Sequence, residues 1–274
     1  MKDCFDSDLA EERHAASFKG GGVLFSQKKE GAVFLTDIRI TNKEGEAALG
    51  RARGRYLTLS FDTPSLLLPK QSEHLIHSIA NALCELLPPF HRLLILGLGN
   101  RRLEADCIGV LCAEGVVTIP DEVFSLSPGT LGQTGLEVAS LTRALCEAFG
   151  TDAVLAVDAL AAREKDRLLR AVEISNTGIA PGRGVGNART ALTEETVGAC
   201  VIALGVPTVM RATTFLKQAL LSAGAPCKEA EEGASAGRGL FTTSAHLDED
   251  VEALAHILSK AITQAIEKKR GYSV

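Results

Sequence analysis

Two aspartates in this sequence stand beside short apolar runs, where their carboxyl groups could do acid–base chemistry. Asp106 follows the run 93–96 after a short polar turn, and Asp158 comes directly after the run 153–157. Unbroken apolar runs of this length are typical of strands buried on both faces. Open α/β sheets keep their chemistry at the carboxyl ends of such strands. If the two strands are neighbours, the two carboxyl groups converge.

Two carboxyl groups at hydrogen-bonding range share one proton, because the charge of one disfavours ionisation of the other. One member can then activate a water molecule while the other protonates a leaving group. Such a pair needs neither a metal ion nor a cofactor, and we expect neither. The alternative for Asp158 is the N-cap of a helix, since 159–162 reads as the start of one.

Glycine-rich stretches give weaker indications of a ligand site. Gly97 and Gly99 begin a dinucleotide-binding pattern, but Arg102 stands where its third glycine should be. The stretch 182–186 has glycine at alternate positions and could cradle an anion, yet no Gly-Lys-Ser/Thr follows it. It could equally form the rim of a cleft.

Histidine and cysteine chemistry is also weakly supported. The Gly-x-Ser-x-Gly motif does not occur, so a Ser-His-Asp triad has no support. We expect His74, His77 and His256 to face solvent. The 7 cysteines include no pair with the two-residue gap of a zinc or redox motif. Most are expected to be buried apolar residues, which leaves Cys107, beside Asp106, as the candidate for a reactive thiol.

The composition excludes several classes of function. The chain has 274 residues, a net charge of −5 and 46% hydrophobic residues, which is ordinary for a globular enzyme. It lacks the dense basic block of a nucleic-acid surface. No window reaches the roughly 18 apolar residues of a membrane span, and the N-terminus lacks the apolar core of a signal peptide. We therefore expect a cytoplasmic protein with no nucleic-acid or membrane partner.

The N-terminal part predicts an antiparallel element. Residues 1–20 form a polar lead, with a short helix near Asp8. The runs 23–25 and 32–40 flank a turn and predict a hairpin, and the alternating 55–61 predicts a third strand with one solvated face. A helix is expected over 72–87, before two prolines.

Residues 90–215 alternate strands with helices, which predicts a mostly parallel sheet with helices on both faces. The expected elements are helices at 106–115, 135–149, after Asp158 and at 207–221, and strands at 93–97, 122–126, 153–157, 170–175 and 200–205. Residues 224–239 predict a mobile loop, and 248–268 a closing helix. We expect residues 21–274 to be a single α/β domain, with the small antiparallel part at 21–65.

Several segments in a fixed order resemble the germination protease (spore protease) family of endospore-forming bacteria. The similar segments are GLGN at 97–100 with Asp106, SPG at 127–129 with the glycines and threonine of 132–135, DALAAR at 158–163, ISNTGIAPGRGVGN at 174–187, IALGVPTV at 202–209 and NKEG at 42–45. The resemblance covers nearly the whole chain.

The resemblance implies an endopeptidase that degrades small acid-soluble spore proteins in the cytoplasm of the spore. It also implies a core related to the hydrogenase-maturation endopeptidases, a homotetramer, and a zymogen that loses an N-terminal propeptide. The family's two catalytic aspartates fall on Asp106 and Asp158, which implies an aspartic-type mechanism.

The chain is shorter than typical members of that family. SDLA at 7–10 stands where the family has TDLA near its processing site, so a propeptide would be only about eight residues long. Two other functions remain open. A metal-dependent maturation endopeptidase of the same fold would need a histidine beside two carboxylates, yet none lies between His91 and His246. A catalytically silent scaffold is the third possibility.

Overall fold

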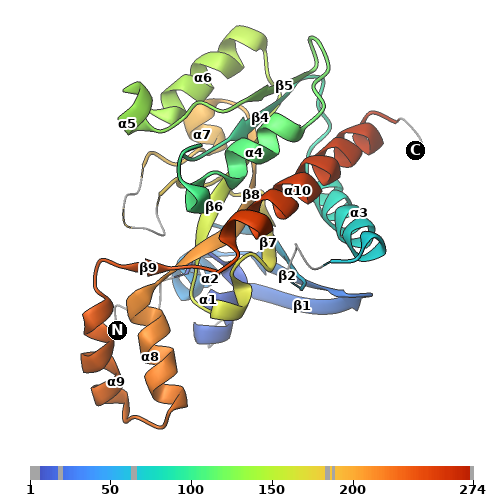
Figure 1. Cartoon of the computed structure of the whole chain (residues 1–274). Coiled ribbons are helices and arrows are strands. Elements are labelled where there is room, and N and C mark those ends of the chain that lie inside the picture. The colour runs from blue at the N-terminus through green and yellow to red at the C-terminus, as the bar shows by residue number, and fades with distance from the viewer. Residues whose placement is uncertain (1–6, 18–20, 63–66, 183–185, 187–188, 272–274) are drawn as a thin grey trace.

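Short apolar runs form the parallel centre of one sheet in the computed structural model. The structure describes residues 7–17, 21–62, 67–182, 186 and 189–271. β4 (Leu93–Gly97) pairs in parallel with β5 (Val123–Leu126) and β6 (Ala153–Ala162), and β6 pairs in parallel with β8 (Cys200–Arg211). The nine-stranded order is β1-β2-β3-β7-β8-β6-β4-β5, with β9 (Phe241–Thr242) paired to β8 (Figure 1). The expected α/β class with a largely parallel core is confirmed.

The antiparallel N-terminal strands belong to the same sheet. β1 (Val23–Glu30), β2 (Val33–Ile40) and β3 (Gly54–Ser60) pair antiparallel, and β7 (Ala171–Ser175) joins β3 to β8, antiparallel to both. The expectation of a solvated face for the third strand is wrong, because residues 56–59 are buried on both faces. β3 is an inner strand with apolar clusters on each side.

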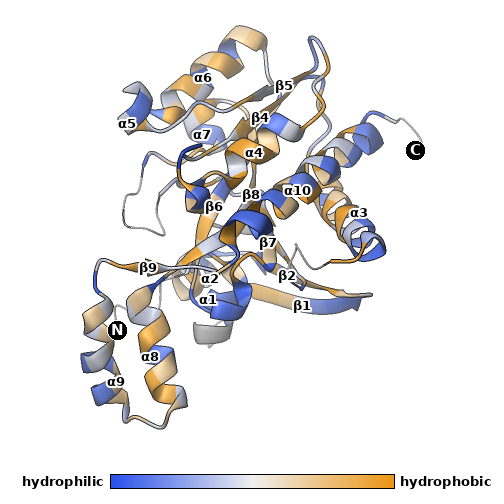
Figure 2. Ribbon diagram, viewed as in Figure 1, coloured by the Kyte–Doolittle hydropathy of each residue, from blue (hydrophilic) through white to orange (hydrophobic). Residues whose placement is uncertain are grey.

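One face of the sheet is covered by α3 (Pro69–Leu86), α4 (Ile108–Gly115) and α10 (Leu247–Lys269). The helices predicted at 72–87 and 248–268 are confirmed. Figure 2 shows α3 and α10 with hydrophobic and hydrophilic residues alternating along them, as expected for helices with one buried side. Alternate strand residues pack under them, among them Leu93, Leu155 and Leu204.

The other face carries two separate groups of helices. α6 (Val138–Phe149) and α7 (Glu194–Val197) cover β4 and the first half of β6, packing on Leu94, Val154 and Ala156. α1 (Ala10–Ser17) and α2 (Lys43–Leu49) cover β2 and β3 around Ile38. The short α5 (Leu131–Thr134) precedes α6. The sheet between these two groups is where a cavity lies.

Two expectations about residues 158–221 are wrong. No helix follows Asp158, because β6 continues to Ala162 and pairs with β8 throughout. Pro207 lies in β8 and not in a helix, next to a register shift between β6 and β8, where a proline is tolerated in a sheet. Tertiary pairing thus overrides the helix preference of the alanines at 159–162.

The predicted loop at 224–239 contains a helix instead. α8 (Ala212–Ser222) and α9 (Cys227–Ala234) form a hairpin that projects from the body (Figure 1). The Ala, Glu and Lys content that suggested a solvated loop also favours a helix. Among the described residues, no helix is both long and apolar enough to cross a membrane.

A glycine on α4 lets this helix pack closely against β6 and the end of β4. A Cβ on Gly109 would lie 2.3 Å from the Val157 carbonyl oxygen and 2.5 Å from that of Leu98. Both are main-chain atoms, which cannot turn away as a flexible side chain can.

We therefore predict that Gly109→Ala lowers the free energy of unfolding by about 2 kcal/mol through overpacking. The melting temperature should fall by about 5 °C in thermal denaturation. Gly132→Ala is the control, because no atom lies within 4 Å of the Cβ it would add. Equal stability of the two variants would show that α4 moves away freely.

Candidate active site

Asp106 lies in a short turn (Glu104–Asp106) that is tied back to the end of β4. The Asn100 N–H donates to both the main-chain oxygen of Asp106, at 3.0 Å, and its Oδ2, at 2.9 Å. Gly99 permits this approach, since its φ is +112° and a Cβ there would lie 1.9 Å from the Asp106 oxygen. Thr208 Oγ1 donates to the Ala105 carbonyl from the other side, at 2.6 Å. The half-buried carboxyl group is thereby held in place.

Asp158 lies inside β6 and not in a loop at its end. Gly97 of β4 pairs with Val157, so Asp158 begins the half of β6 that extends beyond β4. Its side chain is on the same face as Val154 and Ala156, and its exposed fraction is only 4%. The turn after β4 therefore brings Asp106 close enough to Asp158 for its charge to affect the pKa of Asp158.

The two carboxyl groups have unequal proton affinities. Burial, and then the charge of Asp106, raise the pKa of Asp158 well above its ordinary value of 3.8, although the Ala159 N–H opposes the shift. Burial also raises the pKa of Asp106, but the Asn100 N–H stabilises its ionised form. Asp106 therefore ionises first, and Asp158 keeps its proton to higher pH.

Both aspartates line a cavity of about 950 Å³ between the two groups of helices. Its wall includes Gly178–Gly182, the first part of the glycine-rich loop. The rest of that loop, 183–185 and 187–188, lies outside the described residues, so the anion-cradle hypothesis stays untested.

The N-terminal segment lies against this cavity, and the expectation of an accessible lead is wrong for residues 7–13. Asp8 and its neighbours to Arg13 are each at most 9% exposed. The Asp8 N–H donates to the Ala161 carbonyl at 3.0 Å, and the Asp8 carboxylate accepts the Ala161 N–H at 2.9 Å. Glu12 accepts the N–H groups of Arg163 and Glu164 at 2.8 and 2.7 Å. Hydrogen bonds to the end of β6 thus compensate for burying these polar groups.

Two further residues of the cavity were not identified from the sequence. Arg51 precedes β3 and Glu173 lies in β7, and their side chains form an ion pair of 2.6 Å. Glu173 could have been identified from its position within the apolar run 171–175. A charge buried in an inner strand needs a partner, so such a glutamate indicates an ion pair or a functional site.

Other candidates from the sequence lie apart from this chemistry. His74, His77 and His256 are exposed, as predicted. Cys107 is buried and donates to the Glu104 oxygen, and burial raises the pKa of its thiol, which disfavours the reactive thiolate. In the described part of the chain, no three His, Cys, Asp or Glu side chains are grouped so that they could hold a metal ion.

The raised pKa of Asp158 makes its effect on stability depend on pH. The folded protein binds this proton more tightly than the unfolded chain does. The favourable contribution is therefore complete below about pH 4 and is lost as pH rises through the folded pKa.

We predict that Asp158→Asn raises the melting temperature relative to the parent at pH 8, and that the difference shrinks toward pH 4. Asp152→Asn is a control of opposite sign, since the N–H groups of Arg92 and His91 lower the pKa of Asp152. It should destabilise above about pH 4 and lose its effect below. A constant melting difference for Asp158→Asn from pH 4 to 8 would contradict a raised pKa.

Comparison with known proteins identifies the family. The germination protease profile matches residues 4–222. The chain is 35% identical to a germination protease of Clostridium tetani, over 76% of this chain and 68% of the relative, and 37% identical to one of Clostridium perfringens, over 78% and 73%. Among solved structures, the NiFe hydrogenase maturation protease HycI of Thermococcus kodakarensis matches 66% of this chain and 98% of its own, with 22% identity and a TM-score of 0.37. The chain belongs to the germination protease family.

Proposed function

We propose that this protein is an endopeptidase that cleaves small acid-soluble spore proteins, with Asp106 and Asp158 as its catalytic pair. The observation that carries the proposal is a pair of carboxyl groups on the wall of a cavity, one of them buried in the sheet, where burial and the charge of the other raise its pKa. The substrate class is taken from the family. The location in the spore cytoplasm and the homotetrameric assembly are likewise proposed for this chain from the family.

The two carboxyl groups have complementary roles in this mechanism. Asp106, ionised and held by the Asn100 N–H, accepts a proton from a water molecule as that water attacks the peptide carbonyl carbon. Asp158 donates its proton to the developing oxyanion. Asp106 then passes the proton that it took from water to the leaving nitrogen as the C–N bond breaks, and Asp158 regains its proton as the new carboxyl group forms. A neutral Asp158 is suited to this role because an ionised group could not donate.

We predict that Asp106→Asn and Asp158→Asn each lower the rate of cleavage of a small acid-soluble spore protein by several orders of magnitude. The change removes an ionisable group and leaves its size nearly the same. Asp152→Asn, outside the cavity, should cleave at close to the parent rate. Cleavage is followed by gel electrophoresis and mass spectrometry of the fragments.

Three results would contradict this proposal. A folded asparagine variant that cleaves at the parent rate would exclude the pair. Loss of parent activity on adding a chelator, with recovery on adding a divalent metal, would favour the metal-dependent alternative. Absence of cleavage by the parent chain on any peptide would favour the silent scaffold.

The Asp8–Leu9 bond is the processing site that we propose for this chain. It occupies the family's position, and Asp8 is near enough to Asp158 for its charge to contribute to the raised pKa of Asp158. Because residues 7–10 are buried in their own chain, a second molecule has poor access to this bond.

We predict that the cut at Asp8–Leu9, if it occurs, is intramolecular. Intact-mass measurements over time should show loss of residues 1–8 at a first-order rate that does not change with protein concentration, and no loss in Asp158→Asn. A rate proportional to concentration would indicate cleavage between molecules. An intact Met1 in fully active protein would remove the zymogen hypothesis.

A further inference from the structure

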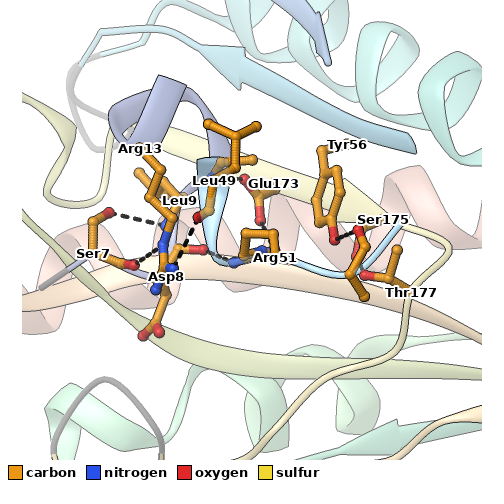
Figure 3. A network of polar contacts seen from close by, with 12 residues as sticks. Ser7, Asp8, Leu9, Arg13, Leu49, Arg51, Tyr56, Glu173, Ser175 and Thr177 are labelled. Atoms are coloured by element: carbon orange, nitrogen blue, oxygen red, sulfur yellow. Dashed lines mark hydrogen bonds and ion pairs between the residues drawn. The ribbon is translucent and has the colours of Figure 1, made fainter. Parts of the chain in front are cut away.

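A segment of the chain itself, residues 7–10, is bound at the cavity partly through its main chain, and Asp8 of this segment lines the cavity (Figure 3). Arg51 Nη1 donates to the Asp8 carbonyl oxygen, and Glu173 Oε2 accepts the Ala10 N–H at 2.5 Å. We propose that Arg51 and Glu173 are positioning residues that bind the main chain of a peptide substrate in the same way. This inference rests on the proposed function, because it assigns binding groups to the same site.

The two side chains form one unit with a donor and an acceptor turned toward the peptide. Arg51 Nη2 and Glu173 Oε1 bind each other at 2.6 Å, which leaves Nη1 and Oε2 for the segment. The side chains are only 17% and 4% exposed, and the Arg51 guanidinium lies 4.6 Å from the centre of the Tyr56 ring. Burying such a pair is unfavourable unless its remaining polar atoms also find partners. The segment supplies these partners now, and a substrate must supply them once the segment leaves.

The place of this pair in the sheet suits a peptide that reaches the two aspartates. Asp158 of β6 and Glu173 of β7 are both in register with Gly205 of β8, so they stand in one row on the same face. Two strand spacings separate them, about 9–10 Å. The Leu160 side chain covers Gly205, with its Cδ1 2.3 Å from the position that a Gly205 Cβ would take, and both residues line the cavity. A peptide bound by Arg51 and Glu173 can therefore reach Asp158 by passing over Leu160.

The segment is held by its main chain as well as by its side chains, since the Leu9 side chain is fully buried and the Asp8 carboxylate accepts the Ala161 N–H. The Asp8 N–H binds the Ala161 carbonyl at 3.0 Å, in addition to the contacts with Arg51 and Glu173. Every peptide has N–H and C=O groups at the same spacing, so a second chain can make the same hydrogen bonds. The tethered segment has a high effective concentration, however, and a free peptide must compete with it.

The first experiment measures this competition with a labelled peptide, Ser-Asp-Leu-Ala-Glu-Glu-Arg, the sequence of residues 7–13. Binding to the full-length chain is followed by fluorescence anisotropy in an Asp158→Asn background, so that cleavage does not interfere. Ala10→Pro in the chain removes the N–H that Glu173 accepts, and proline is tolerated at the first position of a helix such as α1. We expect it to tighten peptide binding severalfold. The same Ala-to-Pro change in the peptide should weaken binding by a similar factor.

The second experiment tests the pair itself in the chain with Asp8→Ala and Ala10→Pro, whose own segment is weakly held. Here Arg51→Met and Glu173→Gln should each weaken peptide binding by about tenfold, the usual effect of losing a hydrogen bond to a charged group. Arg55→Met is the matched control, because Arg55, in β3, pairs with Asp37 and Glu85 outside the cavity. It should bind the peptide as tightly as the background chain.

The outcomes separate this inference from the proposed function, because anisotropy does not require cleavage. Equal binding by the Arg51, Glu173 and Arg55 variants would overturn the inference even if the parent cleaves spore proteins. The inference would also be overturned if the peptide did not bind to the chain with Asp8→Ala and Ala10→Pro, or if the Ala-to-Pro change in the peptide did not weaken binding. The peptide change needs no altered protein, so it decides the matter even if Arg51→Met fails to fold. In cleavage assays, Glu173→Gln should raise KM more than it lowers kcat, whereas a purely structural role would lower the fraction of active protein.

Discussion

The site depends on one electrostatic constraint, which is a carboxyl group buried on the sheet beside a second carboxyl group. Asp158 cannot ionise easily there, because the charged form loses its hydration and is repelled by Asp106. The fold holds the two groups together through the parallel pairing of β4 with β6, through Gly99, and through Gly109. The two glycines allow main-chain atoms to approach more closely than a side chain would permit.

The N-terminal segment is the second feature that shapes the site. Its buried polar groups are bound by main-chain atoms at the end of β6 and by the pair Arg51 and Glu173. These hydrogen bonds, together with the full burial of the Leu9 side chain, hold this segment near Asp158. The same surface that stabilises the intact chain is therefore suited to bind another peptide, and the two occupants exclude each other.

The sequence predicted the aspartates better than it predicted their surroundings. Asp106 and Asp158 stood out because a short apolar run identifies a buried strand, and parallel neighbours bring the ends of their strands together. The helix expected after Asp158 failed because alanine favours helices in isolation, while pairing with β8 decides the conformation of 159–162.

The roles of Arg51 and residues 7–10 could not be read from local patterns. Polar residues near a terminus usually face water, and only long-range contacts, such as that between Ala10 and Glu173, bury these. Glu173 gave a signal as a charge within an apolar strand, yet its partner is far away in the sequence. Pairings of this kind are set by the topology of the sheet, in which β7 lies next to β3.

The central claim is that Asp106 and Asp158 titrate as one pair, with the proton held by Asp158. An NMR titration of the aspartate carboxyl carbons in the full-length chain tests it most directly, with assignments from Asp106→Asn and Asp158→Asn. The account predicts that the Asp158 signal titrates well above the ordinary value of 3.8, and at lower pH once Asp106 is replaced by asparagine. Titration of Asp158 near 3.8, or a pKa that is the same with and without the Asp106 carboxyl group, would contradict it.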